Sequence, residues 1–307
     1  MFKKGFFTTT LLLICSLAVS ATGPIKNIKS ATTFTSRVDE LLSHLTPDQT
    51  SLLQLRLDEQ RVANRNKVAI TYFEPTFIMP FYYTGTPYQQ PYNGLTPLNQ
   101  KIMNEEFKAQ LSLQFTVWNN ILHTPINLNL AYTQLSYWQF YAKSQYFRET
   151  NYEPALFLSD NFTDNWLGMV GIVHQSNGRG GNLERSWNRV FFNLIASGDH
   201  WLINFNPWFL IFKKQSSDLH NPDIARYLGY GRLVFAFGFA KQTISVMFRN
   251  TIASGFKRGA IQIDYTFPIH GKLRGFVQFF SGYGQSMIEY NHYTNSAGIG
   301  LSLYDWV

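Results

Sequence analysis

Cysteine and charge are both scarce in this chain, and each shortage limits what the protein can be. One of its 307 residues is a cysteine, Cys15, and 15% are charged, against about 25% in a typical soluble domain. Cys15 lies in a segment that we expect to be removed, so no disulfide can stabilise the mature chain. Low charge together with 17% aromatic residues is typical of a protein with two chemically different surfaces.

Long apolar runs are also missing. Beyond residue 22 no stretch of about 18 apolar residues occurs, which excludes ordinary transmembrane helices. The net charge of +7 is spread along the chain and forms no basic stripe of the kind that binds nucleic acid. The chain has no G-x-S-x-G motif, so an α/β-hydrolase is not supported.

The first 21 residues have the pattern of a secretory signal peptide. Lys3 and Lys4 are followed by a short apolar segment, residues 11–19, and by Val-Ser-Ala at 19–21, which is typical of a cleavage site. We therefore predict export and cleavage. Residues 22–66 are expected to form an N-terminal extension that is partly helical, because Thr46-Pro47-Asp48-Gln49 resembles a helix start and leucines follow it.

From about residue 67 to residue 307, apolar and polar side chains alternate. Residues 110–117 (QLSLQFTV), 126–133 (INLNLAYT) and 260–267 (AIQIDYTF) each place apolar side chains on one face and polar ones on the other. Transmembrane β-barrels alternate in this way, with the apolar face toward lipid and about ten residues in a strand. The pattern predicts an all-β, antiparallel outer-membrane barrel of roughly ten to fourteen strands.

One stretch, residues 174–189 (HQSNGRGGNLERSWNR), carries candidate chemistry. The alternation puts His174 and Ser176 on the lipid-facing side of one strand, and a turn near residues 178–183 brings Asn188 back beside His174. A serine needs a neighbouring base to become a nucleophile, and that base needs a third group to orient it. Spacing alone leaves open that these are merely polar residues at a strand end.

Several motifs resemble the outer-membrane phospholipase A family. They are His-x-Ser-Asn-Gly-Arg and Arg-Ser-Trp-Asn-Arg within residues 174–189, FRETNYEP at 147–154, Tyr-Thr-Gln at 132–134, Asn-Pro-Asp-Ile at 221–224, Tyr-x-Gly-Tyr at 227–230, Ser-Gly-Tyr-Gly at 281–284 and Tyr-Asn at 290–291. The resemblance implies a twelve-stranded barrel in the bacterial outer membrane. It also implies calcium-dependent hydrolysis of acyl esters at both glycerol positions of phospholipids and lysophospholipids, by a homodimer.

The resemblance also implies roles for single residues. Ser176 matches the nucleophile, His174 the general base and acid, and Asn188 the residue that orients the histidine. The calcium ligands would be the carbonyls of Arg179 and of the partner subunit's Ser144. The third ligand position, a serine in the family, is Glu184 here, and a carboxylate is a stronger calcium ligand than a hydroxyl.

Gln134 matches a glutamine that the family uses across its dimer interface, and its parity in the strand predicts that it faces lipid. Charged residues at 148, 149 and 153 are expected to form a structural network inside the barrel. Two alternatives stay open: a non-catalytic porin, and a lipid A deacylase-type barrel, against which the Asn188 motif and FRETNYEP argue.

Overall fold

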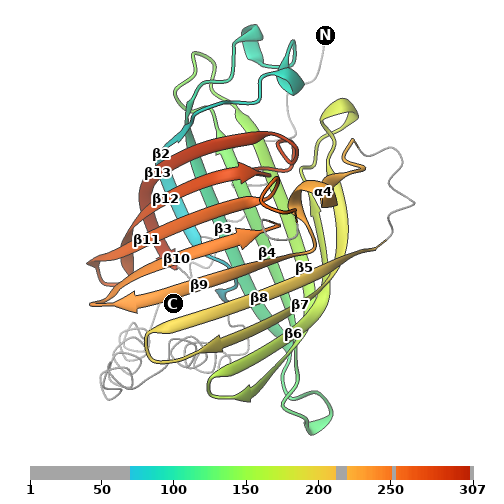
Figure 1. Ribbon diagram of the computed structural model, residues 1–307, viewed down its shortest axis with the longest axis vertical. Helices are drawn as coiled ribbons and strands as arrows, with labels where there is room; N and C mark the ends of the chain where they lie inside the picture. The colour runs from blue at the N-terminus through green and yellow to red at the C-terminus, as the bar shows by residue number, and fades with distance from the viewer. Residues whose placement is uncertain (1–69, 212–219, 251–253, 305–307) are drawn as a thin grey trace, which may run out of the picture. The chain divides into compact units, whose positions relative to one another are not determined.

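The computed structural model describes residues 70–211, 220–250 and 254–304. The predicted signal peptide and the predicted extension at 22–66 lie outside these residues. The described chain is built almost entirely from strands (Figure 1). They are β1 (Ile70–Tyr72), β2 (Thr76–Thr84), β3 (Glu105–Trp118), β4 (Asn127–Trp138), β5 (Phe147–Thr163), β6 (Trp166–Ser176), β7 (Ser186–Ser197), β8 (Trp201–Ile211), β9 (Gly231–Phe239), β10 (Gln242–Arg249), β11 (Ala260–His270), β12 (Leu273–Tyr283) and β13 (Tyr293–Tyr304).

Helical structure in the described residues is limited to short pieces. They are the five-residue helix α4 (Ile224–Leu228) and four 3₁₀ turns: η1 (Gln90–Tyr92), η2 (Pro97–Asn99), η3 (Ile121–His123) and η4 (Gly181–Leu183). Within the described residues there is no helix with the length and apolar character needed to cross a membrane.

The strands form one closed antiparallel barrel. From β3 to β13 each strand pairs with the next one in the chain, and β13 returns to pair with β2, which pairs with β3. β1 and β2 lie end to end along β3, so together they form one interrupted strand and the barrel has twelve. Pro75 has no N–H to give to a ladder, and the Glu74 N–H donates instead to the Ser112 hydroxyl, 3.0 Å away.

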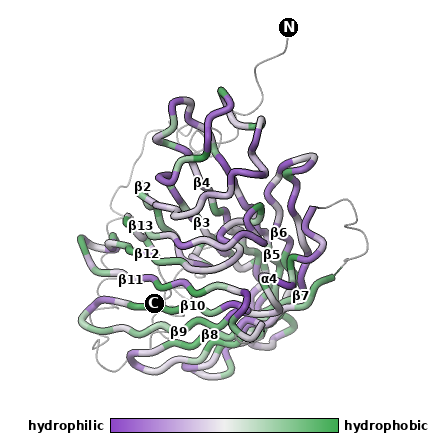
Figure 2. Tube along the Cα trace, turned by 45° about the horizontal axis from the view of Figure 1, so that its top comes forward, coloured by the Kyte–Doolittle hydropathy of each residue, from purple (hydrophilic) through white to green (hydrophobic). Residues whose placement is uncertain are grey.

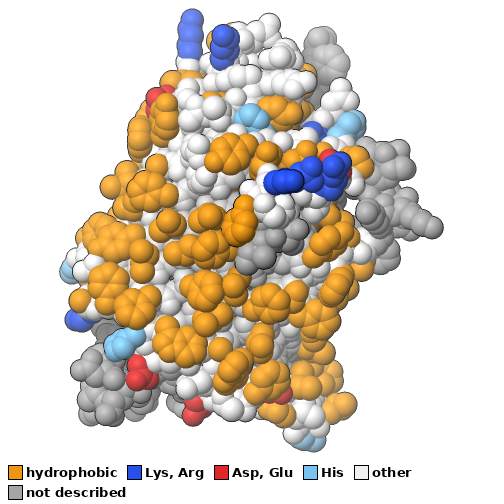
Figure 3. All heavy atoms as spheres, viewed as in Figure 1, with side chains coloured by type: hydrophobic (Ala, Val, Ile, Leu, Met, Phe, Trp, Pro, Cys, Tyr) orange, Lys and Arg blue, Asp and Glu red, His pale blue; other side chains and the backbone are white. Residues whose placement is uncertain are grey.

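The wall of the barrel has two chemically different faces, as the alternation predicted. Large apolar side chains such as Phe115, Ile172 and Phe209 are 43–59% exposed on the outside, and they form a broad belt with charged residues nearer its two ends (Figure 3). Polar side chains of the same strands, among them Ser112, Asn129 and Asp264, are buried inside. Hydrophobic stretches follow the strands, whereas the loops at the upper end are mostly hydrophilic (Figure 2). An apolar outer belt is what lipid requires.

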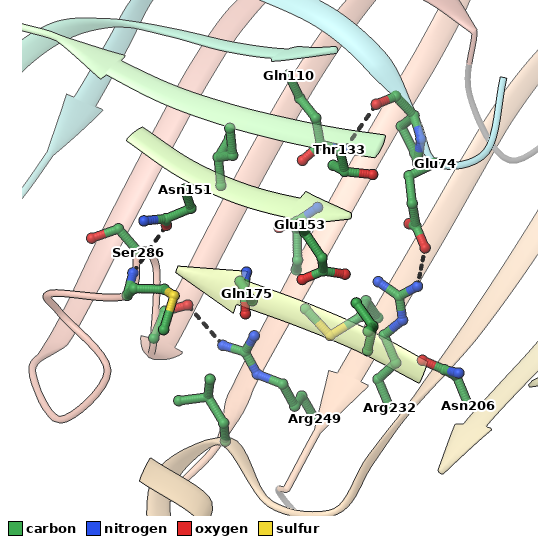
Figure 4. A pocket seen from close by; sticks show the side chains of 18 of the residues that line it. Glu74, Gln110, Thr133, Asn151, Glu153, Gln175, Asn206, Arg232, Arg249 and Ser286 are labelled. Carbon is green, nitrogen blue, oxygen red and sulfur yellow. Dashed lines mark hydrogen bonds and ion pairs between the residues drawn. The ribbon is translucent and has the colours of Figure 1, made fainter. Parts of the chain in front are cut away.

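Charged and polar side chains fill the inside of the barrel around a cavity of about 210 Å³. Glu74 and Arg232 form an ion pair across it, and Arg249 donates to main-chain carbonyls beside it (Figure 4). The first residues of the loop at 284–292 line this cavity, and Met287 and Glu289 of the same loop are buried. The barrel is therefore filled by its own residues at this level.

The predicted strand segments agree closely with the observed ones. Residues 110–117 lie within β3 and residues 260–267 within β11, while the segment 126–133 starts one residue before β4. The closing strand, β13, ends at Tyr304, and residues 305–307 lie outside the described part.

Candidate active site

The β6–β7 hairpin brings the three candidate residues together on the outer wall. In the register of this hairpin His174 lies opposite Asn188, and Ser176 lies opposite Ser186. Ile172, two residues before His174, is 51% exposed, as lipid-facing residues of this strand should be. The hairpin and the parity that the sequence predicted are both present.

His174 and Asn188 are joined by a hydrogen bond of 2.8 Å between Nδ1 and Oδ1. An amide oxygen can only accept, so the bond requires the proton on Nδ1. In the neutral imidazole with its proton on Nδ1, the other ring nitrogen, Nε2, has a free lone pair and can act as a base. Asn188 therefore fixes the tautomer that a general base needs.

Ser176 lies two residues after His174, on the same face of β6. Consecutive residues of one face are about 6.8 Å apart along a strand, which the two side chains can span. Within the residues that the structure describes, the Ser176 hydroxyl forms no hydrogen bond. Hydrogen bonds between nucleophile and base often tighten only when substrate binds.

Gly178 turns the chain directly after the candidate nucleophile. Its φ of +61° lies in the left-handed region, which glycine adopts without strain. A Cβ at this position would lie 3.0 Å from a ring carbon of Tyr152, the residue opposite Ser176 on β5. Gly178 thus lets the loop close over Tyr152 beside Ser176.

Asn177, which the sequence analysis did not single out, organises the loop between β6 and β7. Its side-chain oxygen accepts from the backbone N–H of Arg185 at 3.0 Å and of Arg179 at 3.3 Å, and its amide donates to the Leu183 carbonyl at 2.7 Å. Only the Asn-Gly pair after Ser176 signalled such a turn. Asn177 holds the two segments that contain the predicted calcium ligands.

The oxygen atoms of the predicted calcium ligands differ in whether they already accept hydrogen bonds within the chain. The described part of the chain offers no hydrogen-bond donor to the Arg179 carbonyl and no partner to the Glu184 carboxylate. The guanidinium of Arg185 donates to main-chain oxygens of Asn182 and Glu184 and does not pair with the Glu184 carboxylate. Two oxygens of the predicted set are therefore available to a cation.

Ser144, which would contribute from the partner subunit, is more constrained. Its carbonyl accepts a hydrogen bond of 2.6 Å from Gln100, although a carbonyl oxygen has a second lone pair. No cluster of three or more His, Cys, Asp or Glu side chains able to hold a metal occurs among the described residues. The predicted set consists mainly of carbonyl oxygens, which suit calcium.

Gln134 lies on the outer face of β4, between Leu111 on β3 and Tyr152 on β5, and the register has no bulge there. Its amide is already bonded within the chain, because its oxygen accepts from the Tyr132 hydroxyl at 2.9 Å and its nitrogen donates to Ser136 at 3.2 Å. One amide N–H remains for a contact outside the chain.

The charged residues at 148, 149 and 153 face inward, as predicted. Arg148 pairs with Glu106 and Glu289, all three fully buried. Glu153 pairs with Arg189 at 2.9 Å. Glu149 lies 3.8 Å from the Arg179 guanidinium and accepts a long hydrogen bond of 3.5 Å from Asn177, so it supports the loop between β6 and β7 from the inside.

The chain matches one known protein family over most of its length. The sequence profile of the phospholipase A1 family matches residues 53–303, most of the chain. The chain belongs to the phospholipase A1 family. It is 37% identical to phospholipase A1 of Klebsiella pneumoniae over 209 residues, which are 66% of this chain and 71% of that protein. It is 35% identical to the Escherichia coli phospholipase A1 over 209 residues, 66% of this chain and 70% of that protein.

Solved structures of family members have the same fold. The outer membrane phospholipase A of Escherichia coli superposes with a TM-score of 0.71 at 32% identity, over 78% of this chain and 99% of that one. The Salmonella typhi outer membrane phospholipase, a dimer with bound calcium, gives a TM-score of 0.70 at 32% identity, over 77% and 92%. An Escherichia coli active-site variant, in which an asparagine is replaced by alanine, gives 0.74 at 29% identity, over 83% and 99%.

The predicted family and the predicted twelve-stranded antiparallel barrel are both confirmed. Family membership, the closed barrel and its apolar belt locate the protein in the bacterial outer membrane.

Proposed function

We propose that this protein is a phospholipase that hydrolyses acyl ester bonds of membrane phospholipids and lysophospholipids at both glycerol positions, A1 and A2. The observation that carries the proposal is the His174–Asn188 hydrogen bond on a lipid-facing wall, two residues from a serine. An outward site suits a substrate that is itself part of the membrane. The names of the relatives, phospholipase A1, agree with it.

In the proposed reaction Ser176 Oγ attacks the acyl carbonyl carbon while His174 Nε2 takes the hydroxyl proton. The protonated imidazole then gives that proton to the departing glycerol oxygen, leaving an acyl ester on Ser176. Water, deprotonated by His174, attacks the ester and releases the fatty acid. Asn188 accepts from Nδ1–H throughout and keeps the ring aligned. The asparagine named as an active-site residue in a relative supports this role.

The negative charge on the acyl oxygen needs a donor, for which we propose the backbone N–H of Ser176. We further propose that calcium is held by the Arg179 carbonyl, the Glu184 carboxylate and the partner subunit's Ser144 carbonyl. When bound there, the ion supplies positive charge beside the developing oxyanion and joins two subunits. The calcium-bound dimer of the Salmonella typhi relative supports activation by dimerisation.

Two further proposals concern the N-terminal part of the chain. Residues 1–21 are a cleaved signal peptide, and residues 22–66 form an extension before the barrel at 67–307. The mature N-terminus of secreted protein, read by mass spectrometry, tests the cleavage between residues 21 and 22.

The deciding experiment measures fatty acid released by the purified barrel from mixed micelles of a phospholipid with two different acyl chains. We expect both fatty acids to appear with calcium and neither with a chelator, and Ser176→Ala to be inactive in both. Release that is independent of calcium would contradict the metal proposal. No release, together with ion conduction in planar bilayers, would favour a porin. Release from lipid A alone would indicate a deacylase.

A further inference from the structure

Among the described residues, β7 has no backbone partner on its β8 side before Asn188. The β7–β8 ladder pairs Asn188 with Ile211, and this is its last pair within the described residues. Ser186 begins β7 two residues earlier and lies opposite Ser176. Movement of the start of β7 would displace Asn188 relative to His174, so the contacts that hold Ser186 matter for the site.

Asn221, from the segment before α4, takes the place of a partner strand at Ser186. Its side-chain oxygen accepts from the Ser186 N–H at 3.1 Å, and its amide donates to the Ser186 carbonyl at 2.8 Å. This is the double exchange that two residues of neighbouring antiparallel strands make in a hydrogen-bonded pair. One asparagine side chain therefore replaces one rung of the β-ladder.

The direction of these bonds has a consequence for the site. Because both backbone groups of Ser186 point to Asn221, the Ser186–Ser176 pair across the hairpin is a non-hydrogen-bonded pair, and so is Asn188–His174 two residues on. Such pairs bring opposite Cα atoms to about 4.5 Å, closer than hydrogen-bonded pairs. The close approach suits the side-chain bond between Asn188 and His174.

Asn221 is itself held firmly. It is buried, 5% exposed, and Asp223 two residues later accepts a hydrogen bond of 2.8 Å from the Tyr290 hydroxyl of the loop inside the barrel. Burial raises the pKa of the Tyr290 phenol, and its bond to Asp223 acts in the same direction, so the phenol stays a donor. Ile224 is buried in the hydrophobic core of the barrel. Because its own segment is anchored in this way, Asn221 can hold Ser186 in a fixed position.

We infer that Asn221 is a positioning residue for the outer-wall site: it clamps the start of β7 so that Asn188 stays aligned with His174 beside Ser176. The inference rests on the proposed function, since it assigns a residue that acts through the proposed triad. Asn221 lies on the β8–β9 connection, and both of its hydrogen bonds to β7 are to the Ser186 backbone, so it contributes geometry and no proton.

The test compares Asn221→Ala with Asn250→Ala. Asn250 donates to the carbonyls of Arg226 and Tyr227, both in α4, so its loss loosens the same connection without removing a hydrogen bond to β7. We expect Asn221→Ala to lower kcat about tenfold with KM changed less than about twofold, because small misplacements of reacting groups are costly in rate. Asn250→Ala should keep the wild-type kcat. Equal kcat losses in both variants would overturn the inference.

A second readout separates this inference from the proposed function. A short-chain alkyl sulfonyl fluoride modifies an activated serine, with fluoride as the leaving group, and needs no calcium or phospholipid. We expect Ser176 of the wild type to react about tenfold faster than in Asn221→Ala. An unreactive wild type would contradict the proposed nucleophile. A reactive wild type with an equally reactive variant would overturn only the clamp.

Fold is checked by heat modifiability on gels. If Asn221→Ala does not fold, Asn221→Asp serves instead, because it keeps the acceptor for the Ser186 N–H and loses the donor to the Ser186 carbonyl. It should also react more slowly with the sulfonyl fluoride. A wild-type rate in that variant would count against the clamp.

Discussion

The inner and outer sides of the barrel wall differ in the kind of polar groups that they carry. Inside, Arg148 is held by Glu106 with bonds of 2.8 and 2.9 Å and by Glu289 at 3.2 Å. Outside, His174 bonds to the uncharged amide of Asn188, and both side chains are partly exposed. Charge inside the barrel is surrounded by opposite charge, whereas the acceptor for His174 on the outer wall is an uncharged amide.

This difference gives a physical reason why the proposed orienting residue, Asn188, is an amide. A carboxylate on the lipid-facing wall would have to leave water for hydrocarbon, which is unfavourable for an ion without a partner. Asn188 offers the same acceptor oxygen without a charge. The interior cluster shows what a charged group needs instead, because every carboxylate that Arg148 meets comes from another part of the chain.

The largest expected effect is on the outer wall. Ser176→Ala and His174→Ala should each reduce fatty acid release by about three orders of magnitude or more while the barrel stays folded. Asn188→Ala should lose less, because it transfers no proton. A Ser176→Ala variant that retained more than about a tenth of the rate would refute the nucleophile assignment.

Inside the barrel, a large loss of stability is expected in place of a specific loss of activity. Arg148→Met leaves Glu106 and Glu289 buried without their cation, and breaking a buried pair in this way costs about 3–5 kcal/mol. Urea unfolding in detergent, followed by tryptophan fluorescence, measures the loss. Lys143, exposed in the loop before β5, is the matched control: Lys143→Met should stay within about 0.5 kcal/mol of wild type. Equal stability of Arg148→Met would show that the network is not structural.

A moderate effect, on the calcium dependence of activity, is expected at the predicted calcium site. Glu184→Ser should raise the calcium concentration for half-maximal activity about three- to tenfold, because affinity at oxygen sites rises with ligand charge. Glu184→Gln should shift it in the same direction, since it removes the charge and keeps the size. Superimposable calcium titrations for all three proteins would mean that Glu184 is no ligand.

The smallest effect is expected at Gln134. Polar contacts between subunits in membranes contribute about 0.6–2 kcal/mol, and the bonds to Tyr132 and Ser136 already satisfy most of this amide. Gln134→Ala should therefore weaken the calcium-dependent dimer by a free energy near the lower end of that range. The loss is measured as reduced crosslinking. Crosslinking identical to wild type across a protein dilution series would remove Gln134 from the interface.

Much of the site could be predicted because its residues lie within one hairpin. Strand parity follows from a repeat of two residues, so alternation alone placed His174, Ser176 and Asn188 on the same face. The turn between them was marked by glycines. The same logic put Asp264 inside the barrel, where it is 7% exposed.

The residues that support the site could not be found in this way. Asn177 and Asn221 act through backbone groups that lie 2–8 and 35 positions away in the chain, and no periodic pattern records such contacts. The break between β1 and β2, and the entry of the loop at 284–292 into the barrel, depend likewise on which strands and loops meet after closure.

By itself, the sequence determined the two-faced strands, their antiparallel hairpins and the meeting of His174 with Asn188, because these depend on neighbours within about 15 positions. Only the tertiary structure decided that Glu106 and Glu289, 42 and 141 residues from Arg148, would become its partners, and that Asn221 would complete β7. Those contacts exist because closing the barrel brings distant strands and loops together. Polar groups that are buried there lose their hydration, and only hydrogen bonds or ion pairs with one another compensate for that loss.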